Sequence, residues 1–219
     1  MIEQLISPTV PQLLPTDTGE KAIDVMEESN MEQLPLVEDE KYIALVRESD
    51  LMDWEAPGNE LKTSDFLSYR PAVLAASHPY EAMRLAHQQN LDVIPVVDNE
   101  GNYLGAITRN ELLNYITERS GIDNPGGIIV LEIEPRNYSL YEIARVCESE
   151  EVLLISTQLY SNKVTGMLEV TLKTNRTNLG GIVSSLERYN FKVKEVYGDN
   201  GQDEGMIDRF NLLMNYLNM

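Results

Sequence analysis

The sequence predicts a two-domain protein of the α/β and α+β classes, with a duplicated strand and helix unit first and a βαββαβ domain second. Three observations lead to this prediction: a motif that returns after 60 residues, a cluster of chain-breaking residues after it, and a different order of strands and helices beyond the cluster. At 219 residues the chain is long enough for two domains that each bury a core.

The internal repeat is the most informative feature of the chain. The sequence NMEQLPLV at 30–37 returns as NLDVIPVV at 90–97, an offset of 60. After Gly101 the match continues at an offset of 61, which pairs Tyr42 with Tyr103. A repeat of this kind indicates a duplicated structural unit, and two copies are too few for a solenoid. We therefore expect two copies packed face to face.

Each copy is expected to contain a strand, a helix, two strands and a second helix. In the second copy, the apolar stretch 72–74 predicts a strand and the apolar face of 82–86 predicts a helix. Residues 93–97 predict a buried strand, and its proline lacks a backbone donor, so we expect this strand at the edge or end of a sheet. A hairpin returns through 103–107, and residues 108–111 fit a capping box before the last helix.

The second domain is predicted to begin after the breakers DNPGG at 123–127. Beyond them, apolar stretches predict four strands, and apolar residues at helical spacing predict two helices. The strands are expected at 128–134, 152–160, 168–172 and from 191, the helices near 140–147 and 179–186, and a further C-terminal helix at 207–217. This order gives a ferredoxin-like sheet with both helices on one face.

Charge and composition exclude several classes of partner. The chain has 17 Lys and Arg residues against 36 Asp and Glu, a net charge of −19, of which residues 1–125 carry −15. Nucleic acids and anionic membranes require a basic surface, so neither is an expected partner. No signal peptide or membrane-spanning stretch is readable, which predicts a cytoplasmic protein. The single cysteine, Cys147, lies on an apolar helix face and is expected in the core.

Groups that could carry catalysis or bind a metal are few. His78 and His87 are the only histidines, and a spacing of nine residues does not place both on one helix face as metal ligands. The sequence contains no dinucleotide-binding glycine motif, no Walker A motif and no nucleophile elbow. We therefore expect neither an enzyme nor a metal site.

The second copy carries Ile94-Pro95-Val96-Val97-Asp98 and then GAITRNEL at 105–112. These residues resemble the CBS domain, whose signature is a hydrophobic-Pro-Val strand, an acidic hairpin and a Gly-x-Ile-Thr-x-x-Asp-Leu ending. The resemblance implies a tandem CBS pair, or Bateman-type module, over residues 1–122, with repeats of about 1–60 and 61–122. It also implies a non-catalytic regulatory protein that binds an adenine nucleotide in the cleft between its repeats.

In that family the Thr-x-x-Asp ending holds the ribose, and the hydrophobic-Pro strand flanks the base. The implied nucleotide-binding residues are Ile94, Pro95, Thr108 and Glu111 in the second repeat, and Arg47 and Asp50 at the matching positions of the first. A ribose diol can donate two strong hydrogen bonds to one carboxylate, and an Arg fork suits phosphate. The alternative is structural: Thr108 and Glu111 form only a helix cap, and Arg47 and Asp50 form only a solvated ion pair.

The charge of the first 125 residues bears on which ligand is expected. It repels polyphosphate unless Arg84, Arg109 or a bound Mg²⁺ offsets it locally. AMP or an adenine nucleoside is therefore expected in preference to ATP.

Residues 127–199 look like an ACT domain, a module that senses small molecules, so the second domain is expected to be ACT-like over 127–219. In that family the loop after the first strand often contacts the effector. Here this loop is 135–139, without the usual glycine, and the implied effector-binding residues are Asn137, Tyr138 and Ser139. An amino-acid carboxylate could dock at the free N–H groups of the helix that follows, but Ser139 as a simple N-cap would satisfy the same donors.

The combination of a CBS pair and an ACT-like domain is similar to the acetoin-utilisation accessory proteins of bacteria. It implies a homodimeric sensor that couples an adenine-containing ligand to a second small-molecule effector and acts on a partner enzyme. The alternative is a ligand-blind dimeric scaffold that presents a surface to such an enzyme. The departures from the family motifs at Arg47, Glu111 and the 135–139 loop favour this alternative.

Overall fold

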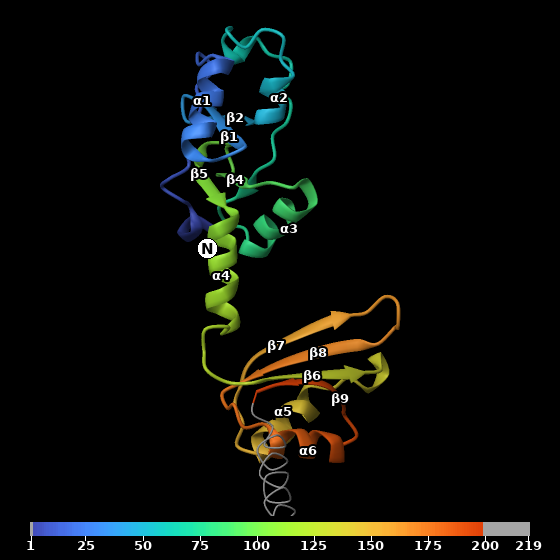
Figure 1. Ribbon diagram of the computed structural model, residues 1–219. Coiled ribbons are helices and arrows are strands. Elements are labelled where there is room, and N and C mark those ends of the chain that lie inside the picture. Colours follow the sequence, from blue (N-terminus) through green and yellow to red (C-terminus); the bar gives the residue numbers. More distant parts are fainter. Residues whose placement is uncertain (1, 199–219) are drawn as a thin grey trace, which may run out of the picture. The chain divides into compact units, whose positions relative to one another are not determined.

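The computed structural model describes residues 2–198 (Figure 1). The chain divides into two compact units, one ending at Ile116 and the other beginning at Thr117, and each has its own hydrophobic core. No helix among the described residues is long and apolar enough to cross a membrane.

The first repeat combines a helix with a two-stranded hairpin. Its elements are α1 (Gly19–Ser29), β1 (Gln33–Glu38), β2 (Lys41–Arg47) and the short α2 (Glu48–Met52). Thr18 caps α1, because its side chain accepts a hydrogen bond from a backbone N–H of the first turn. Asp39 and Glu40 turn the hairpin with positive φ values of 47° and 65°. The strand expected before α1 is reduced to one parallel bridge between Leu13 and Leu36.

The second repeat has the predicted order of elements, with one correction. Its elements are β3 (Val73–Leu74), α3 (Pro79–Gln89), β4 (Val93–Val97), β5 (Tyr103–Thr108) and α4 (Arg109–Ser120). The prediction that the proline-containing strand lies at a sheet edge is wrong, because β4 lies between β3 and β5. The proline is tolerated there because β3 pairs only with Val96 and Val97 and does not extend to Pro95.

The chain segments that precede the two repeats are exchanged between them. Ile2 is fully buried in the core of the second repeat, and Ser7 pairs with strand β5. Conversely, Leu61 is fully buried in the core of the first repeat, and the N–H of Leu45 on β2 donates to the carbonyl of Tyr69 at 2.9 Å. Each repeat is therefore completed by the segment that precedes the other one.

The two hairpins meet at residues that the repeat pairs in sequence. The rings of Tyr42 and Tyr103 stack with their centroids 6.4 Å apart. The N–H of Tyr42 donates to the carbonyl of Gly101 (3.2 Å), and the N–H of Tyr103 donates to that of Glu40 (2.7 Å). Burial raises the pKa of Tyr103 to about 12, and burial also raises the pKa of Tyr42. The predicted packing of the two copies against each other is confirmed at these hairpins.

The second unit contains the predicted order of strand, helix, strand, strand, helix, strand. Its elements are β6 (Ile128–Ile133), α5 (Leu140–Ser149), β7 (Leu154–Ser161), β8 (Leu168–Thr174), α6 (Gly180–Arg188) and β9 (Lys192–Tyr197). All neighbouring strands are antiparallel in the order β7-β8-β6-β9, which is a ferredoxin-like arrangement (Figure 1). The predicted C-terminal helix at 207–217 lies outside the described residues.

One face of this sheet forms the core of the second unit. Alternate residues of β6 and β8 pack with the apolar stripes of α5 and α6, so both helices cover the same face. Cys147 on α5 is 1% exposed, and burial raises its pKa to about 11, as expected for a core thiol. Gly126, before β6, has a φ of 147°, and any Cβ there would overlap the carbonyl oxygen of Thr174.

Candidate nucleotide-binding cleft

The predicted ribose-binding pair lies where β5 meets α4. Glu111 Oε2 accepts hydrogen bonds from the backbone N–H of Thr108 (3.0 Å) and from the Thr108 hydroxyl. Burial alone would raise the pKa of Glu111, but the bonds from Thr108 and a further one from the Ser7 hydroxyl outweigh it and lower the pKa. The side chain is therefore a carboxylate held by small hydroxyl groups.

This carboxylate lines a cavity of about 790 Å³ between the two repeats. The first repeat contributes the C-terminal end of α1 and the loop after it, together with Glu48. The second repeat contributes Asp92, Val93 and residues 108–111, and the N-terminal segment contributes Thr9. A cavity of this size suits a ligand of nucleoside or nucleotide dimensions.

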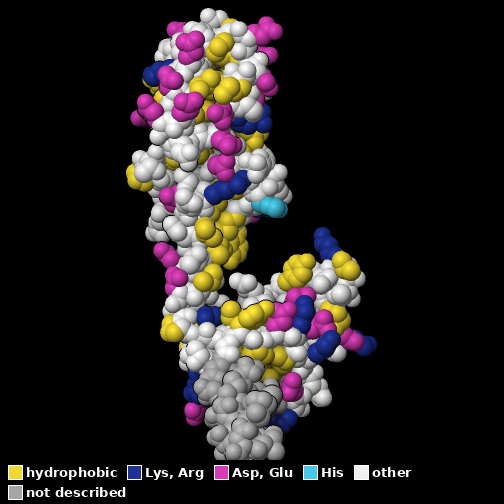
Figure 2. All heavy atoms as spheres, in the orientation of Figure 1, with side chains coloured by type: hydrophobic (Ala, Val, Ile, Leu, Met, Phe, Trp, Pro, Cys, Tyr) yellow, Lys and Arg dark blue, Asp and Glu magenta, His cyan; other side chains and the backbone are white. Residues whose placement is uncertain are grey.

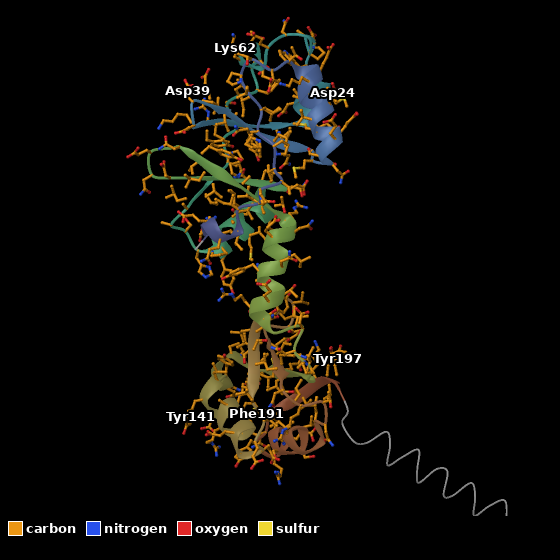
Figure 3. All side chains as sticks on the ribbon, turned by 90° about the vertical axis from the view of Figure 1, so that its left-hand side faces the viewer. Asp24, Asp39, Lys62, Tyr141, Phe191 and Tyr197 are labelled. Carbon is orange, nitrogen blue, oxygen red and sulfur yellow. The ribbon has the colours of Figure 1, made fainter. Side chains whose placement is uncertain are left out.

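The cleft carries mainly negative charge. Its acidic side chains are Glu27, Glu32, Glu48, Asp92 and Glu111, and its one basic side chain is Arg109. The guanidinium of Arg109 is already engaged, because its Nε donates to the carbonyl of Leu91 (2.7 Å) and pairs with Asp92 (3.0 Å). Acidic side chains also spread over the visible face of the first unit (Figure 2), and Asp24 and Asp39 are exposed at the surface of this unit (Figure 3). This lining favours a neutral or weakly anionic ligand over a polyphosphate.

The two residues expected to flank a base, Ile94 and Pro95, do not line the cleft. Ile94 is fully buried and belongs to the core of the second repeat, and Pro95 is also buried. The residue of β4 that lines the cleft is Val93. A role for Ile94 and Pro95 in holding a base thus stays a prediction, with Val93 as their neighbour at the cavity wall.

The matching pair in the first repeat has a different environment. Arg47 makes a bidentate pair with Asp50, with Nε 2.9 Å from Oδ2 and Nη2 3.0 Å from Oδ1. Its guanidinium lies over the ring of Tyr69, 4.6 Å from the centroid. Arg47 lines a second cavity of about 510 Å³, and Glu32 and Glu48 line both cavities.

The residues that the sequence did not identify come mostly from distant segments. They are Thr9, Met26, Glu27, Ser29, Asn30, Met31, Glu32, Glu48 and Asp92, which line the larger cavity without belonging to the Thr-x-x-Asp motif. No local pattern marks them, and the only available signal was the repeat itself, which places Asn30 and Asn90 at the same point of each copy.

The predicted effector loop in the second unit borders a cavity of about 450 Å³. Asn137 and Ser139 line this cavity, whereas Tyr138 packs against the core. The Ser139 hydroxyl accepts a hydrogen bond from the N–H of Glu142 at 3.3 Å and thus caps α5. The Asn137 amide donates to the Glu134 carboxylate at 3.3 Å. Residues 2–198 contain no group of His, Cys, Asp and Glu side chains arranged to hold a metal ion.

The first unit matches a known family along both repeats. A family model for the CBS domain matches residues 2–56 and again residues 65–118. This part of the chain is a tandem CBS pair. Proteins that contain CBS pairs are typically regulatory and not catalytic, and they typically bind adenine nucleotides.

Several solved structures are similar to this chain at low sequence identity. CBSX2 from Arabidopsis thaliana, in a complex with AMP, is 19% identical with a TM-score of 0.46, covering 53% of this chain and 96% of its own. A CBS domain pair/ACT domain protein from Thermotoga maritima is 16% identical with a TM-score of 0.47, over the same shares. The cytosolic domain of the Mg²⁺ channel MgtE, in a complex with ATP, is 18% identical with a TM-score of 0.42, covering 51% of this chain and 46% of its own.

Proposed function

We propose that this chain is a non-catalytic regulatory protein that binds an adenine-containing small molecule, AMP or a nucleoside, in the cleft of its CBS pair. The observation that supports this most is the Glu111 carboxylate at the wall of the cavity of about 790 Å³. An ionised carboxylate beside hydroxyl groups can accept both hydroxyls of a ribose. The Thr108 hydroxyl, which now donates to Glu111, can turn to the ligand.

The charges of the cleft narrow the ligand class. A ligand with three phosphates would meet five carboxylates and one arginine that is already paired. A nucleoside carries no phosphate charge, and a monophosphate carries less negative charge than ATP. Both therefore meet weaker repulsion from these carboxylates. Affinity should therefore fall from adenosine or AMP to ATP in the absence of Mg²⁺.

Calorimetry with adenosine, AMP and ATP tests this proposal. Glu111→Gln keeps an acceptor for the Thr108 N–H and so preserves the helix cap, but it removes the charge. We expect it to weaken adenosine by about tenfold, the difference between a charged and a neutral hydrogen bond. The exposed Glu38→Gln is the matched control and should leave binding unchanged. Unaltered affinity in Glu111→Gln would reduce this pair to a helix cap.

For the second unit we propose an ACT-like role, with an amino-acid effector at Asn137 and Ser139. The ferredoxin-like strand order and the cavity beside these residues support it. A free carboxylate could approach the start of α5, where the helix dipole favours an anion. Asn137→Ala should abolish a thermal shift caused by an amino acid and leave any adenosine shift intact. If no amino acid stabilises the protein, the loop is only a helix cap.

The competing proposal is a ligand-blind homodimeric scaffold for a partner enzyme. It is favoured by the closure of both motifs on themselves, since Glu111 is bonded to Thr108 and Arg47 is bonded to Asp50. A thermal-shift screen separates the two proposals, because a ligand at one hundred times its Kd should add about 2.7 kcal/mol to the free energy of unfolding. If the protein is a dimer and none of the nucleotides, nucleosides or amino acids stabilises it, the scaffold proposal is supported.

A cytoplasmic location stays a prediction, which cell fractionation can test.

A further inference from the structure

The two repeats build the same corner from different residues. Leu45 in β2 and Ala106 in β5 are equivalent at the offset of 61. Ser7 pairs with Ala106, its N–H donating to the Ala106 carbonyl at 2.8 Å, and the N–H of Leu45 donates to the carbonyl of Tyr69 at 2.9 Å. Tyr69 therefore occupies in the first repeat the place that Ser7 occupies in the second.

In the second repeat this corner contains only small side chains. The Thr108 hydroxyl bonds to Glu111, and the Ser7 and Thr9 hydroxyls lie 2.9 Å apart. None of these groups has the volume to cover the carboxylate, and the corner opens into the larger cavity. A ligand hydroxyl can replace the Thr108 hydroxyl at Glu111 after a single side-chain rotation.

In the first repeat the equivalent corner is filled. Arg47, at the position of Thr108, directs two guanidinium nitrogens to the two oxygens of Asp50, which stands at the position of Glu111. Tyr69 covers the guanidinium from one side. A ribose could reach Asp50 only by breaking both hydrogen bonds and the cation–π contact together.

The side chain of Gln33, in the first repeat, also has its hydrogen bonds satisfied within the protein. Gln33 is 8% exposed and lines the smaller cavity. Its amide donates to the carbonyl of Asn90 at 3.2 Å, and its oxygen accepts from the N–H of Asp92 at 3.1 Å. The equivalent residue of the second repeat is Val93, whose apolar side chain has no hydrogen-bonding group.

We infer that the first-repeat site is closed by the stack of Arg47 on Tyr69 and its pair with Asp50, so that each chain binds one adenine ligand, at the second repeat. The guanidinium takes the place of the ligand in the closed half. This inference rests on the function proposed for the cleft of Glu111. The pair of repeats is thus functionally asymmetric, with one responsive half and one fixed half.

Titration calorimetry with adenosine and AMP tests the closure through stoichiometry. The wild-type chain should bind one ligand, and the double variant Arg47→Thr/Tyr69→Ser, which copies Thr108 and Ser7, should bind two. Arg145→Thr is the matched control, because Arg145 also pairs with a carboxylate three residues away (Glu142) and lies 4.8 Å from a tyrosine ring centroid, in the second unit. It should leave one ligand per chain. Circular dichroism checks that the double variant remains folded, and Arg47→Thr alone serves if it does not.

The outcomes separate this inference from the function on which it rests. Two ligands on the wild type, or one ligand on the wild type and still only one on a folded variant with an opened corner, would overturn the closure. No ligand on the wild type but one on the opened variant would reject binding at Glu111 and still support the closure. No ligand on either protein would reject both.

Discussion

Gln33 is the buried polar side chain that joins the two repeats, and its removal should destabilise the first unit. It accepts a hydrogen bond from the N–H of Asp92 (3.1 Å) and donates one to the carbonyl of Asn90 (3.2 Å). Gln33→Met keeps a similar side-chain volume and removes both bonds. Each bond contributes about 1 kcal/mol, and a buried group left without a partner costs about 1 kcal/mol more at the least. We expect the free energy of unfolding to fall by about 2 to 3 kcal/mol.

The single tryptophan makes this measurement specific to the first unit. Trp54 is half-buried, with its ring edge to face against Phe66 at 5.6 Å, so its fluorescence reports the first unit whether or not the second is folded. In a urea titration the midpoint should fall while the slope stays constant. Gln4→Met, on an exposed residue, is the control and should change the stability by less than about 0.5 kcal/mol. A similarly small change for Gln33→Met would refute the assigned role of its two hydrogen bonds.

Four further predictions concern backbone strain, pH, thiol reactivity and assembly. Gly126→Ala should destabilise the second unit by more than about 3 kcal/mol, because strain at its positive φ adds to the overlap with Thr174, whereas Gly58→Ala, whose Cβ would make only an ordinary contact with Glu20 at 3.9 Å, should be nearly neutral by circular dichroism. The lowered pKa of Glu111 means that its stabilisation is present above the ordinary pKa of 4.5 and is lost as the pH falls through the lower folded value, so an acid titration should destabilise the wild type more steeply than Glu111→Gln. Cys147 should resist thiol reagents at pH 8 until the protein is unfolded, and reaction of the native protein would contradict its burial. Light scattering should give a homodimer, twice the chain mass of 24.8 kDa, and a monomer at micromolar concentration would contradict this.

The order of elements was predictable because it depends on local patterns. Buried strands such as 93–97 read as short apolar runs, and the repeat made each element of one copy a check on the other. In the second unit the helical stripes of α5 and α6 and the alternation in β8 gave the βαββαβ order. The central position of β4 was missed, because the length of β3 depends on tertiary packing and not on its own three apolar residues.

The candidate cleft was only partly predictable. The sequence identified Thr108 and Glu111 from a motif, but most of the rest of the lining comes from residues between Thr9 and Glu48, about 60 or more residues earlier in the chain. The role of Tyr69 was missed for a definite reason. The repeat offset of 60 aligns Tyr69 with Thr9, whereas the backbone pairing aligns it with Ser7, since the segment before β3 is two residues shorter. A change of spacing between two copies is thus a place where equivalent residues must be established from backbone pairing.

The exchange of leading segments limits where this pair of repeats can be divided into fragments or recombined with another protein. A fragment limited to 61–116 would lack Ile2 and Ser7, and one limited to 2–60 would lack Leu61 and Tyr69. Neither fragment should fold alone, yet the two mixed together contain every missing contact and should reassemble as a split protein. A chimera that borrows one repeat from another CBS protein must also borrow the segment that leads into the other repeat. The structural unit of this part of the chain is therefore the pair of repeats, although the sequence motif occurs once in each repeat.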